Sequence, residues 1–295
     1  MANFVLVTPA HNEQDVIEQT IQAVIKQTCL PLKWVIVSDR STDSTDTIVK
    51  KYEQQYDFIK LLRRDEGTGR DTAAKVATVN KGIEYLKQFD YDFIGNLDAD
   101  VTFDPDYFEQ LLAIYAKEPK FGLIGGRIYH LINGKMVENK CAIESVAGAI
   151  QLFRRECWEQ IGGYLPLKGG FEDSVAELSA RYHGWTTLSI KGLKVLHLRE
   201  IGTVSRTIWK ARFNDGINEY TFGYKYYYHL LRLLYYLPEK PVLLGSIVVF
   251  FGYLYAMLTC RKKFVPSYLL PLHHKEQWER VRDRFFPRQT TPTHK

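Results

Sequence analysis

Short β-branched runs alternate with amphipathic stretches through the first two hundred residues, and this alternation constrains the fold more than any other feature of the sequence. Residues 4–7 predict a strand, and residues 15–26 predict a helix because their apolar side chains recur every three or four positions. The same signals predict strands at 34–37, 59–62, 93–97, 123–125 and 149–153, and helices around Ile48 and at 73–86. Such alternation predicts an α/β fold whose parallel or mostly parallel sheet carries helices on both faces.

Charge is distributed unevenly along the chain. Residues 1–239 contain 29 basic and 31 acidic side chains, a net charge of −2, whereas residues 240–295 contain 10 and 3, a net charge of +7. The two values sum to the +5 of the 295-residue chain. A near-neutral body with a basic end is typical of binding to a membrane surface or another anionic partner, and it argues against nucleic acid as a partner.

The carboxyl-terminal part contains an uncharged run of twenty residues, 241–260, followed directly by Arg261, Lys262 and Lys263. This run is long enough to span a bilayer, but it could also lie in the membrane interface or re-enter it, or be a buried helix. Positive flanking charges favour the cytoplasmic side of a membrane. An interfacial or re-entrant arrangement on the inner leaflet is therefore favoured over a single span.

The expected location and division of the chain follow from these patterns. No basic leader precedes the first predicted strand, so the amino-terminal body is expected to be cytoplasmic. The four cysteines have no CxxC or zinc-like spacing, which is typical of free thiols in a reducing compartment. We expect a catalytic domain at 1–202, aromatic and basic interface helices at 203–239, and a hydrophobic membrane-associated segment with a basic amphipathic tail at 240–295.

Three polar segments follow predicted strands: TPAHNE at 8–13, SDRSTDST at 38–45 and NLDAD at 96–100. Ligands of such sheets bind at the carboxyl ends of the strands, so these segments form the candidate site. Asp98 and Asp100 stand two residues apart, which lets both carboxylates face one hard divalent cation such as Mn²⁺ or Mg²⁺. A solvated turn is the alternative for this pair.

Together these segments resemble the motifs of family 2 glycosyltransferases, which are inverting enzymes that use nucleotide sugars. TPAHNE resembles the family's PxxNE element, VSDRSTDST resembles VDDGSTDGT with Arg40 in place of the usual Gly, and NLDADV resembles the DxD segment. GGFED at 169–173 matches the acceptor-side ED element, and the resemblance covers about residues 4–200. It implies the GT-A fold, a Rossmann-like mixed sheet with helices on both faces, here followed by membrane-associated helices at the carboxyl end.

The resemblance assigns a set of residues to the nucleotide sugar. These residues would frame the nucleotide, contact its base or ribose, or approach the diphosphate. The set comprises Pro9, His11, Asn12, Glu13, Asp39, Arg70, Asp98 and Ala99. Alternatives stay open for two of them, because Asp39 could cap a helix and Arg70 could be a solvated loop arginine. Arg40, the departure from the motif, could reach a phosphate or face water.

The same resemblance assigns the metal and the acid–base chemistry. Asp100 would be the principal ligand of Mn²⁺ or Mg²⁺, with Asp98 and His197 also in the metal site; a core histidine is the alternative for His197. Asp173 would act as general base on the acceptor hydroxyl, and Glu172 would orient the acceptor. Both acids fall at the start of a helix predicted over 172–182, where helix capping is the alternative.

These residues lead to the hypothesis of a divalent-metal-dependent, inverting glycosyltransferase. The donor would be a nucleotide-diphosphate sugar, with UDP favoured, and the acceptor would be a hydroxyl group of a polysaccharide or of a lipid-linked saccharide of polyprenyl-phosphate type. The enzyme would act at the cytoplasmic face of the cell membrane, held peripherally or integrally by its carboxyl-terminal region.

Two other functions are alternatives to this hypothesis. A nucleotidyltransferase of related fold would need a glycine-rich amino-terminal signature ending in Lys, and LVTPAHNE is not such a signature. A non-catalytic nucleotide-sugar-binding protein would not need intact Asp98, Asp100 and Asp173.

Overall fold

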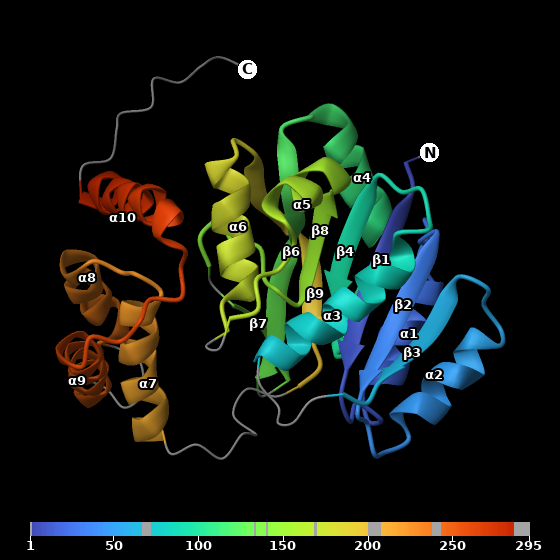
Figure 1. The fold of residues 1–295 in the computed structure, drawn as a ribbon, viewed down its shortest axis with the longest axis horizontal. Coiled ribbons are helices and arrows are strands. Elements are labelled where there is room, and N and C mark those ends of the chain that lie inside the picture. The colour runs from blue at the N-terminus through green and yellow to red at the C-terminus, as the bar shows by residue number, and fades with distance from the viewer. Residues whose placement is uncertain are drawn as a thin grey trace. The chain divides into compact units, whose positions relative to one another are not determined.

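The computed structural model describes residues 2–66, 72–132, 134–139, 141–167, 170–199, 208–237 and 243–285. The chain divides into two compact units, Met1–Thr203 (unit 1) and Val204–Lys295 (unit 2). Unit 1 is an α/β body, and the described part of unit 2 is helical (Figure 1). Each unit is described by itself.

The first half of unit 1 is a parallel sheet connected by helices. Its strands lie in the order β3-β2-β1-β4 and all run parallel. They are β1 (Phe4–Ala10), β2 (Lys33–Asp39), β3 (Ile59–Arg64) and β4 (Phe93–Leu97), and the helices between them are α1 (Ile17–Ile25), α2 (Thr45–Glu53) and α3 (Thr72–Leu86). The strands and helices expected in this half are confirmed, apart from a few residues at their ends.

The second half of unit 1 adds antiparallel pairs, which make the sheet mixed. β8 (Ile150–Arg154) runs antiparallel to β4, β6 (Phe121–Ile132) runs antiparallel to β8, and β9 (Thr186–His197) runs parallel to β6. β5 (Val101–Phe103) pairs with β9, and β7 (Lys135–Glu138) pairs with β6. The helices of this half are α4 (Tyr107–Lys117), α5 (Arg155–Ile161) and α6 (Glu172–Tyr182). The helix predicted over 172–182 is therefore confirmed.

Both faces of the sheet are buried, which explains the continuous apolar runs of its central strands. Successive side chains of a strand point to opposite faces. Phe4 and Leu6 of β1 join an apolar cluster with residues of α1 and α4, whereas Val5 and Val7 join a second cluster with residues of α3 and α5. Helices thus cover both faces of the sheet, as the sequence predicts (Figure 1).

Four segments that are distant in sequence meet at one edge of this sheet. The carboxyl ends of β1, β2 and β4 lie there because these strands are parallel. β9 brings His197 beside them, since His197 pairs with Val101 of β5, just after the 96–100 segment. This edge positions the candidate site.

Unit 2 is held together by close helix packing and a buried polar cluster. It contains α7 (Ile208–Thr221), α8 (Tyr226–Tyr236), α9 (Leu244–Leu258), a short 3₁₀ helix (Ser267–Leu269) and α10 (Leu270–Phe285). α7 and α9 cross at Gly216 and Gly252, where a Cβ atom on either glycine would collide with a carbonyl oxygen of the other helix. Glu219 accepts hydrogen bonds of 2.6 Å from Nδ1 of His229 and from Nε of Arg232, which tie α7 to α8.

The uncharged run 241–260 contains one helix, α9, of 15 residues. None of the helices in the described part of the chain is long and apolar enough to cross a bilayer. The membrane-associated helices expected at the carboxyl end are therefore not confirmed. One side of α9 is buried within unit 2, at Val249, Gly252 and Ala256 among others, while Leu244, Ile247, Phe251 and Leu258 are exposed.

Candidate active site

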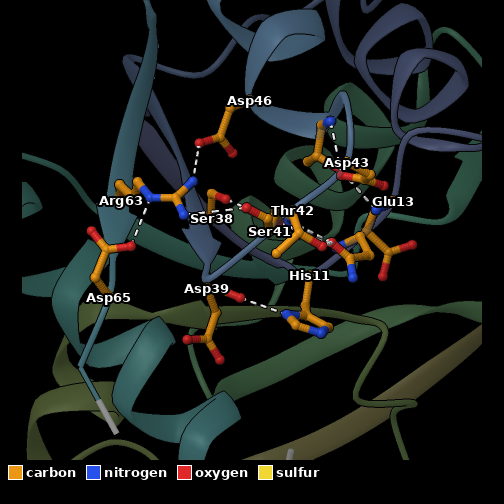
Figure 2. A network of polar contacts seen from close by, with 12 residues as sticks. His11, Glu13, Ser38, Asp39, Ser41, Thr42, Asp43, Asp46, Arg63 and Asp65 are labelled. Carbon is orange, nitrogen blue, oxygen red and sulfur yellow. Dashed lines mark hydrogen bonds and ion pairs between the residues drawn. The ribbon is translucent and has the colours of Figure 1, made fainter.

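The loops after β1 and β2 are joined by a network of hydrogen bonds (Figure 2). Asn12 has a φ of 52°, a left-handed conformation that asparagine tolerates better than most residues. Its Oδ1 accepts a hydrogen bond of 2.8 Å from the Thr42 amide, and the Glu13 amide donates one of 2.8 Å to Oγ1 of Thr45. Asn12, assigned to the nucleotide by the sequence, thus joins the two loops in this structure.

Asp39, the last residue of β2, is held between two arginines and a histidine. Arg40 Nε and Nη2 donate to its Oδ1 and Oδ2 at 2.9 and 3.0 Å, and Arg64 Nη1 donates to Oδ1 at 2.8 Å. The parallel register of β2 and β3 places Arg64 beside Asp39, and Nδ1 of His11 lies 2.5 Å from the Asp39 carbonyl oxygen (Figure 2). Burial opposes ionisation of the Asp39 carboxyl, but the bonds and charges of both arginines outweigh it and lower its pKa.

A cavity of about 300 Å³, the donor cavity, opens beside these loops. Most of the residues that the sequence assigns to the nucleotide and metal line it, namely Pro9, His11, Glu13, Asp39, Asp98, Ala99 and Asp100. Lys75 and Thr78 of α3 and Arg199 add to the lining. Asn12 is not part of it, and Arg70 lies outside the described residues.

The two carboxylates of the DxD segment have different partners. Lys75 Nζ lies 3.0 Å from Oδ1 of Asp98. Asp100 is buried, and its Oδ2 lies 3.3 Å from Nε of Arg199, which also pairs with the Glu13 carboxylate. Burial and the negative charge of Asp98 raise the pKa of Asp100, against the opposing charges of His197, Arg199 and Lys75. The donor cavity is therefore lined by charges of both signs, with more carboxylates than cations.

His197 approaches the DxD segment as the sequence predicts. Its Nε2 lies 3.6 Å from Oδ1 of Asp100, and its Nδ1 is buried without a hydrogen-bond partner. In the part of the chain that the structure describes, no group of three His, Cys, Asp or Glu side chains is arranged to hold a metal ion. Asp100 and His197 could therefore supply part of a metal shell, but the described residues do not assemble a complete one.

Asp173 lies in a narrow crevice, the base crevice, which adjoins the donor cavity. Asn96, Gly148, Tyr164 and Glu172 line it with Asp173, and Lys75 lines both the crevice and the cavity. Oδ1 of Asp173 accepts a hydrogen bond of 2.7 Å from the Ser174 amide in the first turn of α6. Burial and the charge of Asp173 raise the pKa of Glu172, whereas Lys75, whose Nζ is 4.0 Å from Glu172 Oε1, opposes this effect.

The loop 144–148 is fixed against α6 by buried polar groups. Glu177, one turn after Asp173, accepts hydrogen bonds from the Val146 amide at 2.8 Å and from Oγ of Ser145 at 3.4 Å. Burial, and to a smaller extent the charge of Asp173, raises the pKa of Glu177 to about 8. Asn96 Nδ2 donates to the Gly148 carbonyl at 2.6 Å, so the loop is anchored from both sides of the base crevice.

Lys75 is the functional candidate that the sequence prediction missed. Burial works against its positive charge, but the carboxylates of Asp98, Glu172 and Asp173 outweigh burial and raise its pKa. One signal was available, because Lys75 is the only charged residue in the otherwise apolar and small stretch TAAKVATV at 72–79. The structure also brings Arg199 to the donor cavity.

Comparison with known proteins identifies a family for part of unit 1. The model of Glycosyl transferase family 2 matches residues 5–145, which contain β1 to β4, the loops after β1 and β2, and the DxD segment. The match identifies residues 5–145 as a family 2 glycosyltransferase domain. The matched motifs lie at the carboxyl ends of parallel strands, where the donor cavity is found.

Curated relatives of this glycosyltransferase include synthases of a polysaccharide, poly-beta-1,6-N-acetyl-D-glucosamine. Poly-beta-1,6-N-acetyl-D-glucosamine synthase of Staphylococcus epidermidis is 25% identical over 171 residues, which are 52% of this chain and 39% of the relative. The synthase of the same name from Staphylococcus aureus (strain MSSA476) is 31% identical over 116 residues, which are 39% of this chain and 26% of the relative. The match with this chain thus spans about two fifths of these relatives or less.

Solved glycosyltransferases share the fold. Mannosyltransferase PcManGT from Pyrobaculum calidifontis, in complex with GDP-Man and Mn2+, aligns with a TM-score of 0.56 at 16% identity, over 73% of this chain and 61% of its own. S. aureus TarS 1-349 in complex with UDP aligns with a TM-score of 0.53 at 18% identity, over 66% of this chain and 60% of its own. At these identities the likeness shows the fold alone, which is the GT-A-like mixed α/β fold expected from the sequence.

Proposed function

We propose that this family 2 glycosyltransferase moves a sugar from a nucleoside diphosphate, with UDP-sugars favoured, to a hydroxyl group of a lipid-linked or polysaccharide acceptor. One observation carries the proposal: Lys75 lines both the donor cavity, with Asp98 and Asp100, and the base crevice, with Asp173. A donor in the cavity and a base in the crevice would therefore both lie beside Lys75. The TarS complex with UDP supports a UDP-sugar as donor. The names of the polysaccharide synthases support a saccharide as acceptor.

Asp173 is proposed as the general base of an inverting transfer. Inversion needs one group to take the proton of the acceptor hydroxyl while its oxygen attacks the anomeric carbon and the diphosphate leaves from the opposite face. No second carboxylate is needed as a nucleophile, in contrast to retaining hydrolysis. Glu172 would orient the acceptor beside Asp173. Lys75 would hold Asp98 and Glu172 in place and add positive charge on the donor side of the base.

A divalent metal ion fits the residues present. Asp98 and Asp100 offer carboxylate oxygens to the donor cavity, and Nε2 of His197 lies 3.6 Å from Oδ1 of Asp100. Mn²⁺ and Mg²⁺ commonly take their remaining ligands from phosphate oxygens and water, so an incomplete protein shell suits them. Such an ion would neutralise charge on the leaving diphosphate. The PcManGT complex with GDP-Man and Mn2+ supports this proposal.

The test is turnover of a panel of nucleotide sugars with Mn²⁺, Mg²⁺ or EDTA. Asp173→Asn should lower kcat by about 10²–10⁴-fold, because a positioned base contributes about that factor. Asp100→Ala should abolish the dependence of turnover on metal concentration. Asp57→Asn, at an exposed position of unit 1, should change neither kcat nor this dependence. Full turnover by Asp173→Asn would show that Asp173 is not the general base. Absence of donor binding with either metal would contradict the proposed function.

The products separate the alternative functions. A glycosyltransferase releases the nucleoside diphosphate, and the anomeric configuration of its product, read by NMR, is inverted relative to the donor. A nucleotidyltransferase releases pyrophosphate, and a non-catalytic protein binds a nucleotide sugar without turnover. The lipid-linked acceptor is tested by comparing a polyprenyl-phosphate saccharide with the same saccharide released from its lipid.

We also propose that unit 2 holds the enzyme at the cytoplasmic face of the cell membrane, on an anionic bilayer surface. The exposed side of α9 presents Leu244, Ile247, Phe251 and Leu258 at the spacing of one helix face. The exposed cations Arg261 and Lys262 follow directly, and the Arg261 guanidinium lies over the Tyr255 ring at 5.5 Å. Apolar insertion next to basic side chains is the usual way in which a helix lies on an anionic membrane.

Sedimentation with vesicles tests this surface. The full chain should bind vesicles of mixed phosphatidylglycerol and phosphatidylcholine more strongly than vesicles of phosphatidylcholine alone. Phe251→Ser and Lys262→Glu should each weaken binding, whereas Leu30→Ser, an equally exposed apolar position in unit 1, should not. Equal binding by all four proteins would exclude α9 as the membrane surface.

A further inference from the structure

The hairpin formed by β6 and β7 ends in exposed apolar side chains. β6 is buried from Gly122 to Ile128, but its last two residues, Leu131 and Ile132, are 49% and 44% exposed. Met136 and Val137 of β7 are 48% and 44% exposed. We call these four side chains the hairpin tip. Strands of an antiparallel pair that face water usually alternate apolar with polar residues, and the hairpin tip does not.

The side chains of the hairpin tip lie on both faces of the hairpin. Leu131 pairs with Met136 across the two strands, so these two residues share one face. Ile132 and Val137 come next along their strands and therefore point to the opposite face. A protein that packs against a hairpin covers one face, whereas lipid surrounds an inserted hairpin on both. The hairpin tip therefore fits a bilayer better than the flat surface of another protein.

Positive side chains accompany the hairpin tip. Lys135, the first residue of β7, is exposed, and the exposed Lys194 of β9 has its Nζ 6.0 Å from the centre of the Tyr129 ring. Oε1 of Glu138, the acidic residue of β7, lies 3.9 Å from Nη1 of the buried Arg127. Apolar side chains next to basic ones are complementary to the surface of an anionic membrane.

The hairpin tip lies close to the candidate active site. His130, the residue before it, pairs with His197 of β9 on one side and with Val137 of β7 on the other. Neighbouring strands are about 4.8 Å apart, so Val137 lies about 10 Å from His197. Nε2 of His197 is 3.6 Å from Oδ1 of Asp100, which lines the donor cavity. A membrane that receives the hairpin tip would therefore lie beside the donor cavity.

We infer that the hairpin tip inserts into the interface of an anionic bilayer and brings the active site to its surface. This contact belongs to unit 1 and is separate from the exposed side of α9 in unit 2. The inference rests on the proposed function, in which the enzyme works at a membrane on a lipid-linked acceptor. A saccharide linked to a lipid of that bilayer would then be presented at the surface that faces the donor cavity and the base crevice.

Sedimentation of the full chain with vesicles of mixed phosphatidylglycerol and phosphatidylcholine tests the insertion. Leu131→Ser/Met136→Ser removes the apolar side chains of one face, and Ile132→Ser/Val137→Ser removes those of the other. Each double variant should bind vesicles about tenfold more weakly or worse, because two apolar side chains no longer enter the lipid. Circular dichroism of each variant shows whether the fold is kept.

The matched control is Leu30→Ser/Leu32→Ser. Both leucines are similarly exposed, at 47% and 42%, but they precede β2 and so lie at the opposite end of the parallel strands. This double variant should bind vesicles as the native chain does.

A charge reversal tests the electrostatic part of the contact. Lys135→Glu should weaken binding to the mixed vesicles by about tenfold and change binding to phosphatidylcholine vesicles much less, because it acts through the anionic lipid. Lys117→Glu, at an exposed position of α4, is the control and should bind as the native chain does. Equal binding by Lys135→Glu and Lys117→Glu would contradict a basic contact at the hairpin.

The outcomes separate this inference from the proposed function. If both double variants of the hairpin bind vesicles as tightly as the native chain while Phe251→Ser binds more weakly, the inference is wrong and the membrane contact of unit 2 stands. If sedimentation velocity shows a dimer that one of the two double variants makes monomeric, the hairpin packs against a second copy and the inference is also wrong. If the native chain binds neither kind of vesicle, the proposed membrane location fails and the inference fails with it.

Discussion

A Cβ atom on Gly148 would lie 2.5 Å from Oδ2 of Asp173, so the carboxylate proposed as the base rests directly against the backbone of a loop from another part of the sheet. The Gly148 carbonyl is held by Asn96, from the strand that leads into the DxD segment. Val146 in the same loop is held by Glu177, from the helix that carries Asp173. The position of the base therefore depends on three separate segments of unit 1.

Gly148→Ala should displace the Asp173 carboxylate and lower kcat by about a hundredfold, because a shift of about 1 Å in a reacting group can cost that factor. Gly192→Ala is the matched control, since nothing lies within 4 Å of a Cβ atom at Gly192 in β9. Steady-state kinetics of both variants check this prediction. Equal turnover of Gly148→Ala and the native chain would show that the close contact does not position the base.

Lys75→Met should impair both stability and turnover. The change leaves Asp98 and Glu172 without their shared cation, and we expect a loss of about 2 kcal/mol in the free energy of unfolding. Lys75→Arg, which keeps the charge, should recover most of the stability but less of the turnover. Urea unfolding and kcat measurements test this. The control is Lys81→Met, at a half-buried position of α3 that lines neither the donor cavity nor the base crevice. A similar loss in Lys81→Met would contradict a specific role.

Glu177 should make unit 1 less stable as the pH rises. Its pKa is raised from 4.5 to about 8 in the folded chain, mainly by burial, so the folded state holds a proton that the unfolded state has released. The contribution of Glu177 is therefore full below about pH 4.5 and is lost as the pH rises to about 8. The slope between these values is about 1.4 kcal/mol per pH unit.

Melting temperatures of the native chain and of Glu177→Gln test this assignment. They are recorded from pH 5 to pH 8, about the range in which the effect acts. Glu177→Gln should remove this component of the pH dependence, because the amide does not titrate. Glu156→Gln, at an exposed position of α5, should leave it unchanged. An identical pH profile for Glu177→Gln and the native chain would mean that Glu177 is ionised in the folded state.

Gly252→Ala should destabilise unit 2 by about 1–3 kcal/mol, the usual cost of adding a methyl group to a close-packed contact. The added Cβ atom would collide with the backbone of Phe213 in α7. Leu258→Ala, at a position of α9 that is 72% exposed, should change the stability by less than about 0.5 kcal/mol. Chemical unfolding followed by helical circular dichroism distinguishes the two variants, and equal effects would contradict the close α7–α9 contact.

Much of unit 1 could be predicted because its signals are local. The apolar run at 34–37 and the helix at 15–26 follow from periodicity, and both occur in the structure within a few residues of the predicted ends. Most of the nucleotide-side residues follow from motifs located directly after strands, such as His11 after β1 and Asp98 after β4. These motif residues lie close together because a parallel sheet brings the ends of its strands to one edge whatever the details of packing.

Predictions for single side chains were less complete, because the pairing of a side chain depends on the backbone geometry around it. Asn12 belongs to a nucleotide-side motif, yet its side chain joins two loops through Thr42. Arg40 departed from the motif with two alternatives open, and the structure pairs it with Asp39. Neither partner follows from spacing along the chain.

The sequence by itself determined the order of strands and helices along the chain, the family motifs and the uneven distribution of charge. Periodicity, residue type and charge are properties of neighbouring positions, so they can be seen without the fold. The tertiary structure alone decided that Lys75 joins Asp98 to Glu172, that Gly148 rests on Asp173, and that α9 has one buried and one exposed side. Each of these contacts links segments tens of residues apart. Such contacts form only when strand register and helix packing set distances of a few ångströms, which no local pattern specifies.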